Sequence, residues 1–169
     1  ARLGVLFGAD EAAVLVAAAT LHDVGYSPRI AQTGFHPLDG ALYLRSLGLP
    51  ERLCSLVAHH SEAGMLALAQ GVVDLDQQFP RERSLLADAL VYADMHSAPD
   101  GQMIRAEQRL ADIARRRPDP VEAAWAICAC SASCAASSWL SRWTSAARSC
   151  SATRSARDPG RSRCCTACP

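Results

Sequence analysis

Apolar residues recur through the first 129 residues at intervals of three and four, which is the spacing of one face of an α-helix. The clearest run lies in 81–96, where such a face is formed by Leu85, Leu86, Ala89, Leu90 and Ala93. No stretch alternates apolar and polar residues with the period of two that is typical of a strand. The pattern therefore predicts an all-α fold.

Helix boundaries are predicted from capping and helix-breaking residues. Asp10 is expected to cap a helix over 11–23, with Gly25 just past its end. Proline suits the first helical turn, so further helices are expected from His36-Pro37 to Gly48 and from Pro50 to about His60. The pattern also predicts helices at 64–70, 81–96, 102–117 and from 121 to 128, with connections at 26–35, 74–80 and 97–101.

Composition changes near residue 130. Residues 1–129 carry 11 Arg and 16 Asp or Glu, whereas residues 130–169 carry six Arg and only Asp158. The second part also holds six of the eight cysteines, and Leu140 is its only aliphatic residue larger than alanine. Because such a segment cannot build a core, we expect a helical domain over 1–129 and an irregular, low-complexity tail over 130–169, either disordered or translated out of frame.

A zinc or disulfide module is the alternative interpretation of that tail, since Cys164, Cys165 and Cys168 cluster. The spacing argues against it, because no CxxC pair is matched by a second pair and no histidine lies beyond His96.

Charge and hydropathy exclude some classes of function. The formal net charge is zero, which gives no reason to expect a nucleic-acid partner. The longest apolar run, 12–19, is far shorter than the roughly 20 residues that span a bilayer. No signal-peptide pattern opens the chain. These observations favour a cytoplasmic protein with no membrane segment.

Histidine and aspartate occur where the helical pattern predicts burial. His22-Asp23 ends a very apolar helix, and a buried imidazole beside a carboxylate is costly unless paired or ligated. His60 continues the apolar face of Leu53, Leu56 and Val57, whereas His59 is rotated by about 100° toward the rim. A core histidine that bonds a carbonyl group is the alternative for His60.

Two more residues extend this pattern. Asp94 shares a helical face with Leu90 and Val91, where an unpaired carboxylate would be expensive. His36 stands at a helix start, where it could also be an ordinary polar residue. Histidines and aspartates from four separate helices, converging on an apolar interior, predict a divalent-metal site.

Four segments carry a resemblance to a known family: LHDVG, FHPLDGA, AHHSEAG and LADALVYADMHS. They resemble the HD-domain metal-dependent phosphohydrolase superfamily over about residues 1–117. The resemblance implies a compact helical bundle, with His22-Asp23 as the namesake doublet and Asp94 as the distant closing aspartate. The segments look closest to a binuclear branch that includes hydrolases of bis-nucleoside tetraphosphates, in which His36 and His60 (or His59) match two further ligands.

The function implied is metal-dependent hydrolysis of a phosphate ester or phosphoanhydride in a small phosphorylated substrate, such as a nucleotide. Asp23 would be the catalytic, bridging carboxylate, with His22, His36, His60 and Asp94 as the other ligands of one or two divalent ions. Iron or manganese suits these nitrogen and oxygen donors. The alternative is a non-catalytic HD-like module that binds a nucleotide or a protein, or an inactive truncated fragment.

The sequence departs from the family pattern in two places. The family carries another metal-binding histidine on the helix before the doublet, but residues 1–21 contain none, so we expect that an N-terminal piece is missing. The basic residue that often follows the doublet's glycine is Tyr26 here, and Arg29 is the candidate to replace it in substrate binding.

Overall fold

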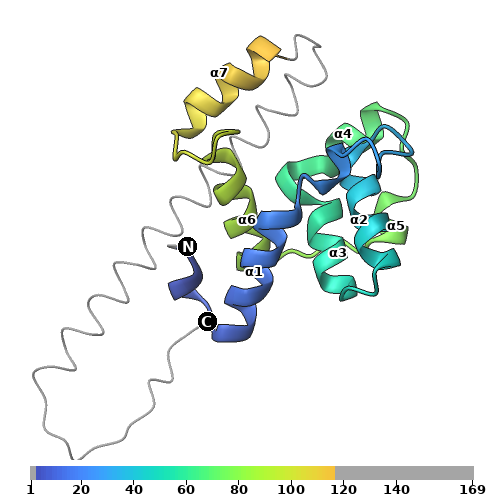
Figure 1. Cartoon of the computed structure of the whole chain (residues 1–169), viewed down its shortest axis with the longest axis horizontal. Helices are drawn as coiled ribbons and strands as arrows, with labels where there is room; N and C mark the ends of the chain where they lie inside the picture. The colour runs from blue at the N-terminus through green and yellow to red at the C-terminus, as the bar shows by residue number, and fades with distance from the viewer. Residues whose placement is uncertain (1–2, 117–169) are drawn as a thin grey trace, which may run out of the picture. The chain divides into compact units, whose positions relative to one another are not determined.

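The structure is a computed structural model that describes residues 3–116, and within this range the chain is helical. The helices are α1 (Ala9–Leu21), α2 (His36–Ser46), α3 (Glu51–Ala58), α4 (Ala63–Ala69), α5 (Leu75–Gln78), α6 (Leu85–Met95) and α7 (Ala106–Arg116) (Figure 1). Short 3-10 helices are η1 (Leu3–Leu6), η2 (Val24–Tyr26) and η3 (His60–Glu62). Residues 3–116 contain no strand, only an isolated bridge between Ser97 and Met103. The all-α prediction is confirmed.

Two apolar clusters share helix α3. One joins α3 to α2, α4 and α5; it contains the large buried side chains Phe35, Leu44, Val57 and Phe79. The other joins α3 to α1 and α6 through Leu15, Ala18, Leu53, Leu56, Leu86, Ala89 and Leu90. Because α3 is buried on two faces, it fixes α1 and α6 relative to α2.

Helix α2 packs against η2 at very short range. A Cβ atom placed on Gly25 would lie 2.0 Å from the carbonyl oxygen of His36 and 2.7 Å from the backbone nitrogen of Gly40. Only glycine allows this approach. The contact brings the turn after α1 against the first turn of α2, and so places Asp23 near His36.

Several predicted boundaries need correction. Helix α1 begins at Ala9 after Gly8, so Asp10 lies inside the first turn and is not the cap. Helix α6 begins only after Ser84, whose hydroxyl accepts a hydrogen bond from the Ala87 N–H. The predicted connection 74–80 contains the short helix α5.

Helix α3 ends earlier than predicted. It stops at Ala58, and His60 opens the separate turn η3. Ser61 and Glu62 then adopt left-handed backbone conformations, with φ of 50° and 59°, which cannot continue a right-handed helix. The predicted helix at 121–128 and the predicted tail at 130–169 lie outside the described residues.

Within residues 3–116, no helix combines the length and the apolar character needed to cross a membrane.

Candidate metal centre

The five residues predicted as ligands come from four parts of the fold. His22 follows α1 directly, and Asp23 precedes η2. His36 is the first residue of α2, His60 opens η3, and Asp94 lies in the last turn of α6. The structure brings all five side chains to one place.

One set of donor atoms is formed by Asp23, His36 and His60. The Nε2 atoms of the two histidines lie 3.2 Å apart, and they lie 3.5 Å (His36) and 3.7 Å (His60) from Oδ1 of Asp23. One ligand atom from each residue falls within 4.8 Å of the other two. Donors about 2.1 Å from a shared ion are separated by about 3.0–3.4 Å, so this set fits one cation.

A second set faces the other oxygen of the same carboxylate. Nε2 of His22 lies 3.3 Å from Oδ2 of Asp23 and 3.5 Å from Oδ1 of Asp94. The two oxygens of Asp23 therefore face two different groups of donors. This is the arrangement in which one carboxylate can join two cations.

The backbone orients two of the histidine rings. Nδ1 of His60 lies 2.6 Å from the Val57 carbonyl oxygen, and Nδ1 of His22 lies 2.9 Å from that of Ala19. A carbonyl oxygen only accepts, so each Nδ1 carries the hydrogen and each Nε2 is turned toward the carboxylates. Such outer hydrogen bonds are typical of metal-binding histidines.

Electrostatics within the cluster are strongly coupled. Burial lowers the pKa of His22, but Asp23 and Asp94 outweigh this effect and raise it to about 10. Burial, together with the charge of His22, lowers the pKa of His60. Although burial alone would raise the pKa of Asp94, its hydrogen bond with His22 holds that pKa well below its usual range. The metal-free cluster thus holds a positive charge at His22, where a metal cation would replace the proton.

Asp39 supports the position of His36 without entering the cluster. Its carboxylate is buried and accepts hydrogen bonds from the backbone N–H groups of Thr33 (2.9 Å) and Gly34 (3.2 Å) and from the Thr33 hydroxyl (2.8 Å). These bonds fix the loop that leads into α2. The aspartate in FHPLDGA therefore has a structural role in this fold.

A cavity of about 510 Å³ opens over the cluster. Besides the five predicted residues, its lining includes Tyr26, Arg109 and Ile113. The Tyr26 ring stacks on the ring of His36 with their centres 3.8 Å apart, and Arg109 Nη2 lies 3.3 Å from Oδ1 of Asp94. Arg109 is not among the predicted site residues, because no motif marks an arginine on a helix that begins twelve residues after Asp94.

His59 lies away from the cluster. Its Nε2 atom is 2.6 Å from the Phe79 carbonyl oxygen and 3.5 Å from Oδ1 of Asp76. The side chain is only 6% exposed, so His59 does not lie at an exposed rim. Arg29 is exposed and does not line the cavity over the cluster.

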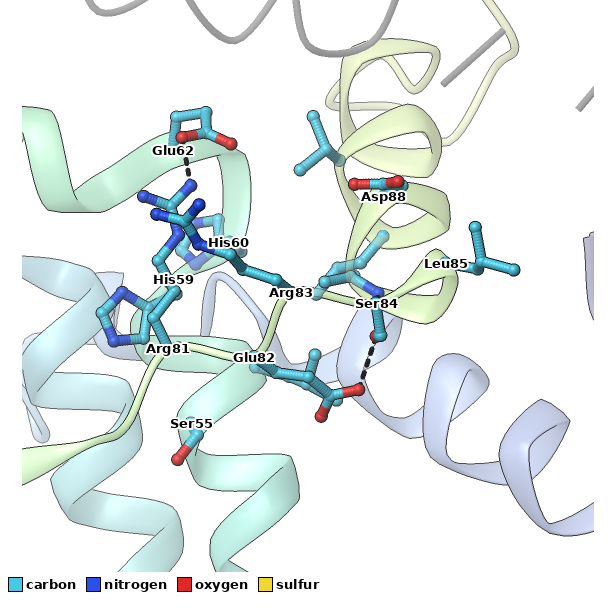
Figure 2. Close-up of a pocket in the computed structure, with 14 residues that line it drawn as sticks. Ser55, His59, His60, Glu62, Arg81, Glu82, Arg83, Ser84, Leu85 and Asp88 are labelled. Carbon is cyan, nitrogen blue, oxygen red and sulfur yellow. Dashed lines mark hydrogen bonds and ion pairs between the residues drawn. The ribbon is translucent and has the colours of Figure 1, made fainter. Parts of the chain in front are cut away.

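A second cavity, of about 550 Å³, is lined by His59 and His60 among other residues. Figure 2 draws its lining side chains. Of the five predicted ligands, only His60 reaches it. Several of its charged side chains pair with one another or with neighbours: Arg81 with Glu62, and Glu82 with Arg52 and Ser84. The candidate metal ligands therefore gather at the cavity over Asp23.

Comparison with known proteins agrees with this geometry. The family profile described as HD domain matches residues 1–116. The chain belongs to the HD-domain family, whose members are in general metal-dependent phosphohydrolases. No curated protein and no solved structure matches the sequence significantly.

Proposed function

We propose that this chain is a metal-dependent hydrolase of phosphate esters or phosphoanhydrides in nucleotides. The observation that carries the proposal is the position of Asp23, whose two carboxylate oxygens face separate sets of nitrogen and oxygen donors. Membership of the HD family supports the same chemistry.

The donors divide into two groups in this proposal. His36, His60 and Asp23 would hold one ion, and His22 and Asp94, together with Asp23, would hold the other. Each group would supply three protein ligands, the number typical of catalytic metal sites. Iron or manganese suits this mixture of imidazole and carboxylate better than calcium does. When bound, such ions polarise a phosphate oxygen and acidify a water molecule.

The protein's own residues keep this arrangement rigid. The carbonyl groups of Ala19 and Val57 fix the rings of His22 and His60. The Ser61 hydroxyl donates to Oδ2 of Asp94, which leaves Oδ1 directed at His22. Asp23 is 48% exposed, so the carboxylate that joins the two groups remains accessible to a substrate.

The cavity suits a nucleotide in size and lining. Its volume of about 510 Å³ lies within the range of small-molecule sites. Tyr26, Pro99 and Ile113 add apolar surface beside the polar cluster. By resemblance to the binuclear branch, bis-nucleoside tetraphosphates are the first substrates to test.

The experiment is a hydrolysis screen of the purified full chain loaded with Mn²⁺ or Fe²⁺, together with elemental analysis. Bis-nucleoside tetraphosphates, nucleoside triphosphates and simple phosphomonoesters are compared by product release. Asp23→Ala is expected to lower activity more than about 100-fold. Loss of a metal ligand should reduce activity more than loss of a group that only hydrogen-bonds to a ligand. Asp76→Ala removes an exposed carboxylate outside the cavity and is expected to leave activity unchanged.

Two results would contradict the proposal. One is a folded protein that takes up no transition metal, which would favour a non-catalytic module that binds a nucleotide or a protein. The other is equal activity in the Asp23→Ala variant and the unaltered chain.

A further inference from the structure

Arg109 introduces a permanent positive charge into the cavity over the metal-binding cluster. It extends from α7, and its side chain is only 15% exposed. No other arginine of the described chain lines this cavity. The remaining charged side chains of the lining are the carboxylates Asp23 and Asp94 and the histidines of the cluster.

The guanidinium group of Arg109 has more hydrogen-bond donors than its contact with Asp94 uses. Nη2 lies 3.3 Å from Oδ1 of Asp94, and Nε is buried without a hydrogen-bond partner in residues 3–116. Guanidinium carries five N–H donors in a planar fork. Burying a donor without an acceptor costs free energy, so an acceptor that reaches the guanidinium group from the cavity would be bound favourably.

Asp94 would change its main partner when the cluster is loaded. In the structure, Oδ1 of Asp94 lies 3.5 Å from Nε2 of His22 and 3.3 Å from Nη2 of Arg109. A cation held by His22 and Asp94 would compete for that oxygen. Arg109 would then point its donors at the space where an anion approaches the cluster.

We propose that Arg109 binds a non-bridging phosphate oxygen of the substrate, and that inorganic phosphate, as a product, binds at the same place. The planar fork of guanidinium donors matches the geometry of phosphate oxygens. This proposal rests on the proposed phosphohydrolase function. Arg109 would then be the basic group in the substrate cavity. Arg29 does not fill this role, because it lies outside the cavity lining.

A purely structural role for Arg109 gives the opposite expectation for metal binding. If Arg109 only held Asp94 in place, its removal would weaken the metal site. If it serves an anion, its removal takes a positive charge away from a bound cation. Metal binding would then stay the same or tighten, while phosphate binding weakens.

The test compares the full chain with Arg109→Gln, Arg109→Lys and the control Arg115→Gln. Arg115 lies on the same helix, but it is 75% exposed and pairs with Asp112. Mn²⁺ affinity is measured first, and then the affinity of the Mn²⁺-loaded protein for inorganic phosphate, both by calorimetric titration. Neither measurement needs turnover.

For Arg109→Gln we expect the phosphate dissociation constant to rise about tenfold to a hundredfold, since a charge-assisted hydrogen bond is lost. Arg109→Lys is expected to show a smaller rise, and Arg115→Gln none. The proposal is overturned if Arg109→Gln binds phosphate as the unaltered chain does, or loses Mn²⁺ affinity by a similar factor. It is also overturned if the Mn²⁺-loaded chain binds no phosphate. A chain that binds Mn²⁺ and phosphate through Arg109, yet hydrolyses no nucleotide, supports Arg109 and contradicts only the proposed function.

Discussion

Two single residues beside the cluster, Ser61 and Glu62, have a strained backbone. Each adopts a left-handed conformation that costs an L-residue about 1–2 kcal/mol. Both side chains have partners that hold the strained backbone: Ser61 donates to Asp94, and Glu62 pairs with Arg81 (Figure 2). Such strain is commonly found at functional sites.

The two neighbouring histidines give a direct test of the site. We expect His60→Ala to abolish binding of one metal ion, because Nε2 of His60 faces His36 and Asp23. His59→Ala is expected to leave metal affinity unchanged, since its ring bonds the Phe79 carbonyl group. Mn²⁺ titration measures both variants, with thermal melting to show that each is folded. Loss of metal only in His59→Ala would contradict the assignment.

The choice between His59 and His60 shows what helical phase can predict. The helical phase of the sequence predicts that the His60 side chain faces the interior. In the structure His60 is buried, with 3% of its surface exposed. The reason for that prediction is wrong, however, because His60 does not continue the apolar face of α3. Helix α3 ends at Ala58, and His60 belongs to the separate turn η3. Local periodicity does not predict that Arg109 lines the cavity. The position of Arg109 depends on how the 97–105 connection folds.

At the scale of elements, the approach of η2 to α2 is the contact on which the cluster depends. The turn after α1 carries His22 and Asp23, and α2 begins with His36. Their separation is set by backbone contact at Gly25, without an intervening side chain. A small shift between the two elements would therefore move donors of both sets at once.

Gly25→Ala tests this contact. Because the new Cβ would lie 2.0 Å from the His36 carbonyl oxygen, the elements must separate, and we expect a loss of about 3 kcal/mol or more in the free energy of unfolding. Metal affinity should fall with it. Gly64→Ala is the matched control: its Cβ meets nothing within 4 Å inside α4, so a gain of about 0.5–1 kcal/mol is expected. Urea unfolding measures both, and equal stability of the two variants would contradict the argument.

The elements themselves were predictable where the apolar pattern was long and regular. The helices at 9–21, 36–46 and 85–95 each fall within a predicted range or within two residues of it. Short elements were harder. Helix α5 has only four residues, and its single buried residue, Leu75, gives no period to detect. Its formation depends on packing against the α2–α3 core, which a local pattern does not contain.

For the molecule as a whole, we expect metal binding to be coupled to the protonation of His22. Asp23 and Asp94 raise the pKa of His22 from 6.5 to about 10, so the ring is protonated at neutral pH in the metal-free chain. This pairing stabilises the metal-free fold fully below about pH 6.5, and the stabilisation is lost as the pH rises toward 10. A metal ion needs the neutral ring, so binding must release the proton.

We therefore expect the apparent Mn²⁺ affinity to rise about tenfold per pH unit between pH 6.5 and pH 8.5, for the ion that His22 binds. Calorimetry in buffers of different ionisation enthalpy gives the number of protons released per ion, which should be close to one. The His22→Gln variant, which has no titrating ring, is the control and should release none at this position. An affinity that does not change over this pH range would contradict the coupling.

The residues of the candidate site occupy only part of the chain. All five predicted ligands and the cavity lining lie between His22 and Ile113, within the range matched by the HD-domain profile. We expect a chain ending at Cys128 to bind Mn²⁺ as tightly as the full chain, and to melt cooperatively.

Titration with Mn²⁺, which prefers nitrogen and oxygen donors, is compared with titration by Zn²⁺, which also accepts thiolates. Six of the eight cysteines lie in 130–169, so a Zn²⁺ stoichiometry that falls on shortening would reveal a second metal site there. Loss of Mn²⁺ binding in the shortened chain would show instead that residues beyond 128 supply part of the centre described here.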